Sequence, residues 1–153
     1  MIETPSIVQT TSVPTAVIHL TVPAADIRNV MGPSFQELLK GIKAQGIAPA
    51  GPWFNYFFKR PSEVFDFEMS MAVASPVVAS GRMKPSQSQA RRVARTVYHG
   101  GYEGLAGAWG ELMAWMEKNG HKGAPDLWEC YSKGPDSSAN PADWRTELNW
   151  PVL

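Results

Sequence analysis

Leu127-Trp128-Glu129-Cys130-Tyr131 is a short run near the C-terminus that places one carboxylate among apolar and aromatic residues. Its composition predicts a β-strand. Strand side chains alternate between two faces, so Glu129 is expected to share its face with Leu127 and Tyr131. A carboxylate in such a setting is solvated at an edge, paired with a lysine or arginine, or available to the positive charge of a ligand.

The length and composition indicate a single domain without a strong charge. The chain has 153 residues, with 14 basic and 14 acidic side chains. The balanced charge gives no general attraction to nucleic acid or to an anionic membrane. No window approaches the ~20 apolar residues of a membrane span, and residues 1–10 do not resemble a signal peptide. We therefore expect a cytoplasmic protein that does not bind membranes.

Cysteine and histidine usage gives no indication of a metal site. Cys130 is the only cysteine, which excludes an internal disulfide and a cysteine-rich zinc site. The three histidines, His19, His99 and His121, are scattered without the spacing of metal ligands. No metal or other cofactor is expected.

The first half of the chain predicts three strands and one helix. The helix is expected to begin at Gly32 and Pro33, because proline fits the first helical position, and to end at Gly46. Its apolar residues recur at the spacing of one buried face: Phe35, Leu38, Leu39 and Ile42. Strands are predicted at residues 7–22, bent at Pro14, and at 53–58 and 65–71. Residues 76–89, with two prolines and a glycine, are expected to be a connector.

The second half repeats this order. Strands are predicted at residues 91–99, 127–131 and 144–152, with a turn-rich loop at 134–141. Between the first two strands lies a helix that Gly120 ends, with an apolar stripe of Leu105, Trp109, Leu112, Met113 and Met116. We predict an α+β fold of two pseudo-symmetric strand-helix-strand-strand modules, at about 5–75 and 88–153 within one domain, that form an antiparallel sheet with both helices on one face. A ligand cleft is expected at the centre.

Four stretches carry a family resemblance. They are Gly51-Pro52-Trp53-Phe54, Phe65-Asp66-Phe67-Glu68, residues 98–105 (YHGGYEGL), and the C-terminal run that starts with Trp128-Glu129-Cys130-Tyr131. In this order they resemble the GyrI-like, or effector-binding, domain, the type found at the C-terminus of BmrR and Rob, over nearly the whole chain. Gly101 departs from a frequent proline. No helix-turn-helix region precedes the domain, so the chain resembles the free-standing members, and no direct nucleic-acid binding is expected.

The resemblance implies an aromatic pocket and an acid that meets cationic, lipophilic ligands. Glu129 matches that acid by its place in the run. Burial among aromatic rings should raise its pKa, and a bound cation should restore its charge. Aromatic rings offer cation-π contacts of roughly 0.5 to 2 kcal/mol each. The candidate walls, each of which could instead fill the core, are Trp53, Phe54, Tyr56, Tyr98, Trp109 and Tyr131. Trp109 fits the core especially well, because it lies on the apolar stripe of its helix.

Three functions are compatible with these features. The first is a stand-alone protein that binds hydrophobic, often cationic, aromatic small molecules. The alternative is a hydrolase that opens the cyclopropane ring of DNA-alkylating natural products, with Glu129 as general base and Tyr98 or Tyr131 as hydrogen-bond donors. The third is an inhibitory partner of a larger enzyme. A homodimer or a regulatory protein partner stays open.

Overall fold

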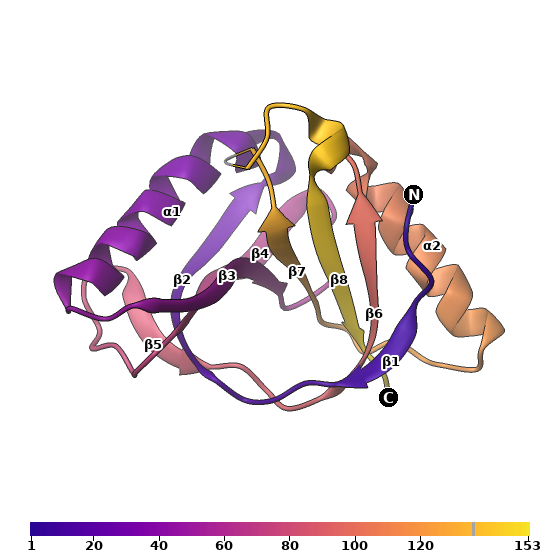
Figure 1. The fold of residues 1–153 in the computed structure, drawn as a ribbon, viewed down its shortest axis with the longest axis horizontal. Helices are drawn as coiled ribbons and strands as arrows, with labels where there is room; N and C mark the ends of the chain where they lie inside the picture. Colours follow the sequence, from indigo (N-terminus) through magenta and orange to yellow (C-terminus); the bar gives the residue numbers. More distant parts are fainter. Residues whose placement is uncertain (136) are drawn as a thin grey trace. The chain divides into compact units, whose positions relative to one another are not determined.

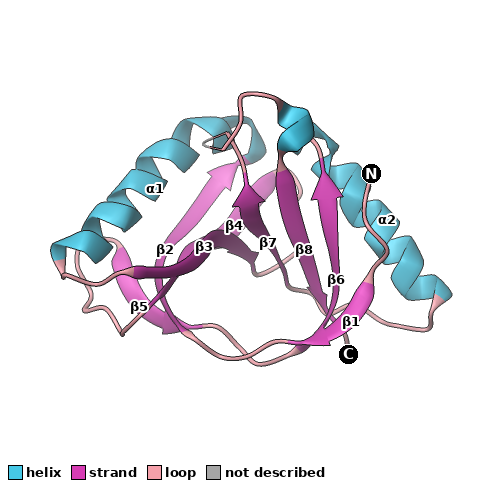
Figure 2. Ribbon diagram, viewed as in Figure 1, coloured by secondary structure: helices cyan, strands magenta, loops and turns pink. Residues whose placement is uncertain are grey.

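The computed structural model describes residues 1–135 and 137–153, which form two compact units. Unit 1 consists of residues 1–10 and 91–153, and unit 2 of residues 11–90. Within the described residues, each unit carries four antiparallel strands and one long helix (Figures 1 and 2). This confirms the predicted α+β class, whereas the ligand cleft stays a prediction.

Unit 2 is built from an antiparallel sheet and the helix that packs on it. Helix α1 (Ile27–Ala44) lies along one face of the sheet (Figure 2). Its Leu38 and Ile42 are fully buried, as the apolar stripe predicts. Gly46 has a φ of 69°, which suits glycine at the end of a helix. The strand order is β3 (Pro49–Phe57), β4 (Val64–Val73), β2 (Pro14–Pro23) and β5 (Met83–Gln87).

Unit 1 repeats that plan. Helix α2 (Leu105–Lys118) follows a short 3-10 turn, Tyr102–Gly104, and buries Ala108, Trp109, Leu112 and Met116. The strand order is β7 (Leu127–Lys133), β8 (Arg145–Pro151), β6 (Arg92–His99) and β1 (Ser6–Gln9). In each unit, the strand after the helix lies at one edge and the strand before the helix lies third. The predicted internal repeat is therefore present in topology as well as in sequence order.

Three predictions about elements were wrong. Residues 7–22 form two strands, because β1 pairs with β6 in unit 1 and β2 pairs with β4 in unit 2. Helix α1 begins at Ile27, so Pro33 is its seventh residue. The ring of Pro33 is exposed there, and a proline removes only one helical hydrogen bond. Residues 76–89 contain β5, whose Pro85 is tolerated because β5 is an edge strand.

Candidate functional site

Glu129 lies in the middle of β7 with its side chain against α2. It is only 6% exposed. The indole Nε1 of Trp109 donates a hydrogen bond to its Oε2 at 2.7 Å, and the hydroxyl of Tyr131 donates to its Oε1 at 2.7 Å. Among the residues that the structure describes, no lysine, arginine or histidine forms an ion pair with it. Both carboxylate oxygens are therefore held by neutral donors.

Local structure explains why these three side chains meet. Tyr131 follows Glu129 by two residues on β7 and so projects from the same face of the strand. Trp109 is 5% exposed on the buried stripe of α2, and its ring meets that of Trp150 edge to face, with centroids 5.7 Å apart. Trp109 therefore belongs to the core and also donates to the carboxylate, so both interpretations of this residue apply.

Burial is the largest influence on the Glu129 carboxyl group. It raises the pKa, because the charged form loses its hydration. The hydrogen bonds from Trp109 and Tyr131 act in the opposite direction and lower the pKa, and burial outweighs them. A positive charge brought next to the carboxylate would favour its ionised form.

Two aromatic residues that the sequence did not single out lie next to Tyr131. The ring of Tyr102 meets that of Tyr131 edge to face, at 5.9 Å between centroids, and Trp144 at 5.0 Å. Tyr102 is 37% exposed, so the group reaches the surface of unit 1. Both residues lie in stretches that carry the family resemblance, but only the fold brings them beside Tyr131. The loop predicted at residues 134–141 precedes Trp144, and its residue 136 lies outside the described residues.

Tyr98 points toward the start of α2 from the same face of the unit 1 sheet. Its hydroxyl donates to the carbonyl oxygen of Gly101 at 2.8 Å, and its side chain is buried. A Cβ atom on Gly104 would occupy the place of this hydroxyl, so glycine is required there. In this structure, Tyr98 holds the turn before α2. Its part in ligand binding or catalysis stays a prediction.

The other three predicted wall residues lie on β3 in unit 2. Trp53 faces α1, where its ring is 5.2 Å from that of Phe35. Phe54 and Tyr56 belong to the opposite face of the strand, and Tyr56 meets Phe58 edge to face at 5.2 Å. The three residues therefore do not share one face of β3. Their contribution to a site with Glu129 stays a prediction.

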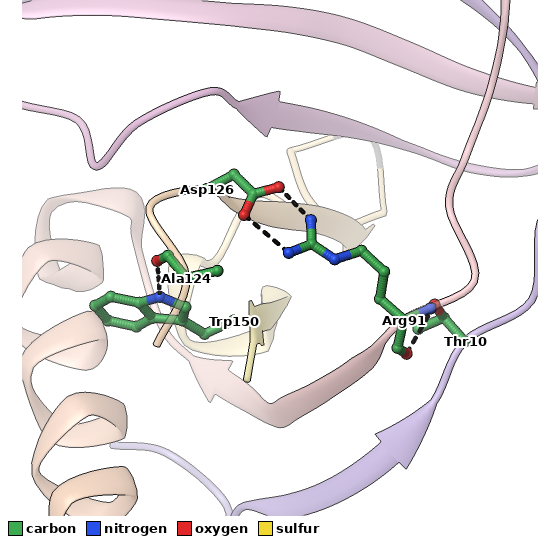
Figure 3. Close-up of polar contacts among 5 residues, drawn as sticks. All are labelled: Thr10, Arg91, Ala124, Asp126 and Trp150. Carbon is green, nitrogen blue, oxygen red and sulfur yellow. Dashed lines mark hydrogen bonds and ion pairs between the residues drawn. The ribbon is translucent and has the colours of Figure 1, made fainter. Parts of the chain in front are cut away.

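The start of β7 is fastened to the start of β6 by an ion pair. The guanidinium of Arg91 binds the carboxylate of Asp126 through both oxygens, with an Nη2 to Oδ1 distance of 3.2 Å (Figure 3). Asp126 immediately precedes β7. On the same side, Trp150 donates from its Nε1 to the carbonyl oxygen of Ala124 at 2.8 Å. These contacts fix the strand that carries Glu129.

Other features of the described residues bear on function classes. Burial, reinforced by the negative charge of Glu147, raises the pKa of the Cys130 thiol to about 12, so this cysteine is not a nucleophile near neutral pH. In the described part of the chain, no three His, Cys, Asp or Glu side chains gather as metal ligands would. No helix there is long and apolar enough to cross a membrane.

Residues 3–153 match the family model of the GyrI-like small molecule binding domain. The C-terminal domain of EcmrR has a similar fold, with a TM-score of 0.87 and 21% identity over 98% of this chain and 97% of that one. EcmrR in a DNA complex gives a TM-score of 0.86 and 23% identity over 97% of this chain, which spans only 57% of that one.

Two further solved structures share the fold at lower identity. SAV2435 bound to tetraphenylphosphonium has a TM-score of 0.66 and 11% identity, covering 99% of this chain and 94% of that one. A hydrolase from Listeria innocua has a TM-score of 0.69 and 12% identity, covering 97% and 91%. At these identities the likeness concerns the fold alone. A search of curated proteins gave no match.

Proposed function

Because the chain belongs to the GyrI-like small molecule binding domain family, we propose that it binds hydrophobic, cationic aromatic molecules at the carboxylate of Glu129. The observation that carries the proposal is the setting of this group. It is buried, it accepts hydrogen bonds from two neutral donors, and it has no cationic partner among the described residues. A buried carboxylate without a countercharge is costly, and an organic cation would supply that charge.

The surroundings suit a lipophilic cation more than a hydrated one. The rings of Trp109 and Tyr131 touch the carboxylate, and those of Tyr102 and Trp144 continue the aromatic surface outward. Aromatic faces attract cations and do not require the ligand to keep its water. The tetraphenylphosphonium bound by SAV2435 is a ligand of this class, which supports the proposal for a protein of the same fold.

The test compares a charged and a neutral probe of similar shape. Titration calorimetry with tetraphenylphosphonium and with triphenylphosphine oxide is carried out on the wild type and on Glu129→Gln. We expect the substitution to weaken the cation roughly tenfold or more, since it removes a desolvated countercharge, and to change the neutral probe less than about twofold.

Glu111→Gln is the matched control for that experiment. Glu111 is exposed on α2, so its substitution makes the same change in net charge without touching the site. The control should bind both probes like the wild type. Cation affinity that is unchanged in Glu129→Gln, or lowered equally in both variants, would contradict the proposal.

The hydrolase hypothesis has less support. A protein with a similar fold is named a hydrolase, and a carboxylate with a raised pKa suits a general base. In this chain, however, both oxygens of Glu129 already accept hydrogen bonds, so an attacking water would have to compete with Trp109 and Tyr131. Incubation with a cyclopropane-containing alkylating compound, followed by mass spectrometry, should show no addition of water.

A further inference from the structure

Thr146 presents a buried hydroxyl that nothing in the described chain satisfies. The residue lies on β8 and is fully buried, at 0% exposure. Its Oγ1 has no hydrogen-bond partner among the described residues. Buried polar side-chain atoms are nearly always hydrogen-bonded in native proteins, so an exception calls for an explanation.

The strand register places this hydroxyl on the Glu129 face of the unit 1 sheet. Glu129 is paired with Leu148 across β7 and β8, and Thr146 precedes Leu148 by two residues. Residues two apart on a strand project from the same face. Thr146 is itself paired with Tyr131, the residue that donates to the carboxylate. Side chains in this diagonal relation lie within about 7 to 8 Å of each other.

The neighbours of Thr146 have committed their own hydrogen bonds elsewhere. Thr146 is flanked by Tyr131 on β7 and by Tyr98 on β6. The hydroxyl of Tyr131 donates to Glu129, and that of Tyr98 donates to the carbonyl oxygen of Gly101. Valine has almost the same shape as threonine and would fill this place without an unsatisfied oxygen. The fold alone therefore does not account for the hydroxyl.

We propose that Thr146 is a second, neutral recognition point of the Glu129 site and that it selects ligands bearing a hydroxyl group. The inference rests on the proposed function, because it assumes that a cation binds at Glu129. A threonine hydroxyl both donates and accepts, so it pairs with a ligand hydroxyl in either sense. The preferred class is then a hydrophobic cation with a hydroxyl group about 7 Å from its charge, and not a wholly apolar onium ion.

The experiment uses one cation with and without the hydroxyl. The probes are tetraphenylphosphonium and the ortho, meta and para isomers of (hydroxyphenyl)triphenylphosphonium. In the wild type, at least one isomer should bind about fivefold more tightly than the parent, the effect of one neutral hydrogen bond. Thr146→Val should abolish this preference while leaving the parent within about twofold, and Thr146→Ser should retain it.

A second variant and the Glu129 substitution make the outcomes separable. Thr146→Ala also lacks the hydroxyl and should lose the preference as well, which covers the case in which the valine variant does not fold. Glu129→Gln should weaken all four probes by a similar factor and keep the preference. If affinity for all four is unchanged in Glu129→Gln, the proposed function fails. If no isomer is preferred, or the preference persists without the Thr146 hydroxyl, the present inference fails while cation binding at Glu129 stands.

Discussion

In unit 1 the strand that follows the helix presents Glu129 to that helix, and in unit 2 the corresponding strand presents Asn55. The two positions match by topology, since each lies on the edge strand after the helix and is paired with the adjacent strand, to Leu148 and to Met69. Both are buried, at 6% and 2% exposure. Each reaches the fifth residue of its helix, Trp109 or Met31.

The difference between these two pairs separates what the fold needs from what is added to it. The amide Nδ2 of Asn55 lies 3.8 Å from the sulfur of Met31, a contact between neutral groups. The carboxylate of Glu129 accepts from the indole of Trp109 at 2.7 Å. Because the same backbone arrangement is completed with a neutral amide in unit 2, the architecture does not require an acid at this point. The charge of Glu129 is better explained by a ligand than by folding.

Asn55→Asp gives unit 2 the acid that unit 1 has and should have the largest effect. The new carboxylate would be buried beside a thioether in place of an indole N–H. We expect the free energy of unfolding at pH 7 to fall by about 3 kcal/mol or more, as for a buried charge without compensation. Urea unfolding at pH 7 measures this. Asn55→Ala, which shortens the side chain without adding charge, is the control. A loss no greater for Asp than for Ala would show that unit 2 tolerates the acid as unit 1 does.

Trp109→Met gives unit 1 the helix residue of unit 2 and should have the next largest effect. The substitution removes a donor to Glu129 and leaves space beside Trp150. We expect a loss of about 2 to 4 kcal/mol in unfolding free energy, typical of a shortened buried side chain. The double variant Trp109→Met with Glu129→Gln reports on the hydrogen bond. If its two effects simply add, the indole N–H contributes nothing through the carboxylate.

Glu129→Gln makes the buried polar groups of both units neutral and should have the smallest effect on stability. Since the folded-state pKa of Glu129 is raised by burial, the carboxyl group stabilises the fold at pH below its ordinary value and loses this contribution as pH rises through the raised value. The variant should therefore match the wild type near pH 4 and become the more stable protein toward neutral pH. The difference grows by about 1.4 kcal/mol for each unit of pKa shift.

Unfolding curves of both proteins from pH 4 to pH 8 measure that difference. Other titrating groups cancel in the comparison, because only residue 129 differs. Glu111→Gln again serves as the control and should show no such trend. A Glu129→Gln protein that is less stable than the wild type at neutral pH would mean that the carboxylate is stabilised by the fold itself.

The sequence predicted what depends on local periodicity. The stripe through Leu38 and Ile42 identified α1, and alternation along residues 127–131 placed Glu129 and Tyr131 on one face. Trp109 could be linked to both the core and the site because it lies on the stripe of α2. The division of residues 7–22 between two units could not be predicted, since it depends on which distant strands β1 and β2 pair with.

The missed site residues have the same physical origin. Thr146 and Tyr131 are 15 positions apart in the chain, and only the register of β7 against β8 makes them neighbours. Tyr102 and Trp144 meet because the turn before α2 and the start of β8 end at the same point of unit 1. Single-sequence patterns carry no information on such register, whereas they do carry the alternation that revealed Glu129.

The chain leaves unit 1 after Thr10 and returns at Arg91, and these two residues are hydrogen-bonded to each other. The backbone N–H of Thr10 donates to the carbonyl oxygen of Arg91 at 2.8 Å, and the N–H of Arg91 donates to Oγ1 of Thr10 at 2.9 Å (Figure 3). Unit 2 is thus an insertion whose entry and exit coincide. A tight hairpin of two to five residues could rejoin the cut ends, so the half of the molecule that bears the acid can be produced as a miniature protein of its own.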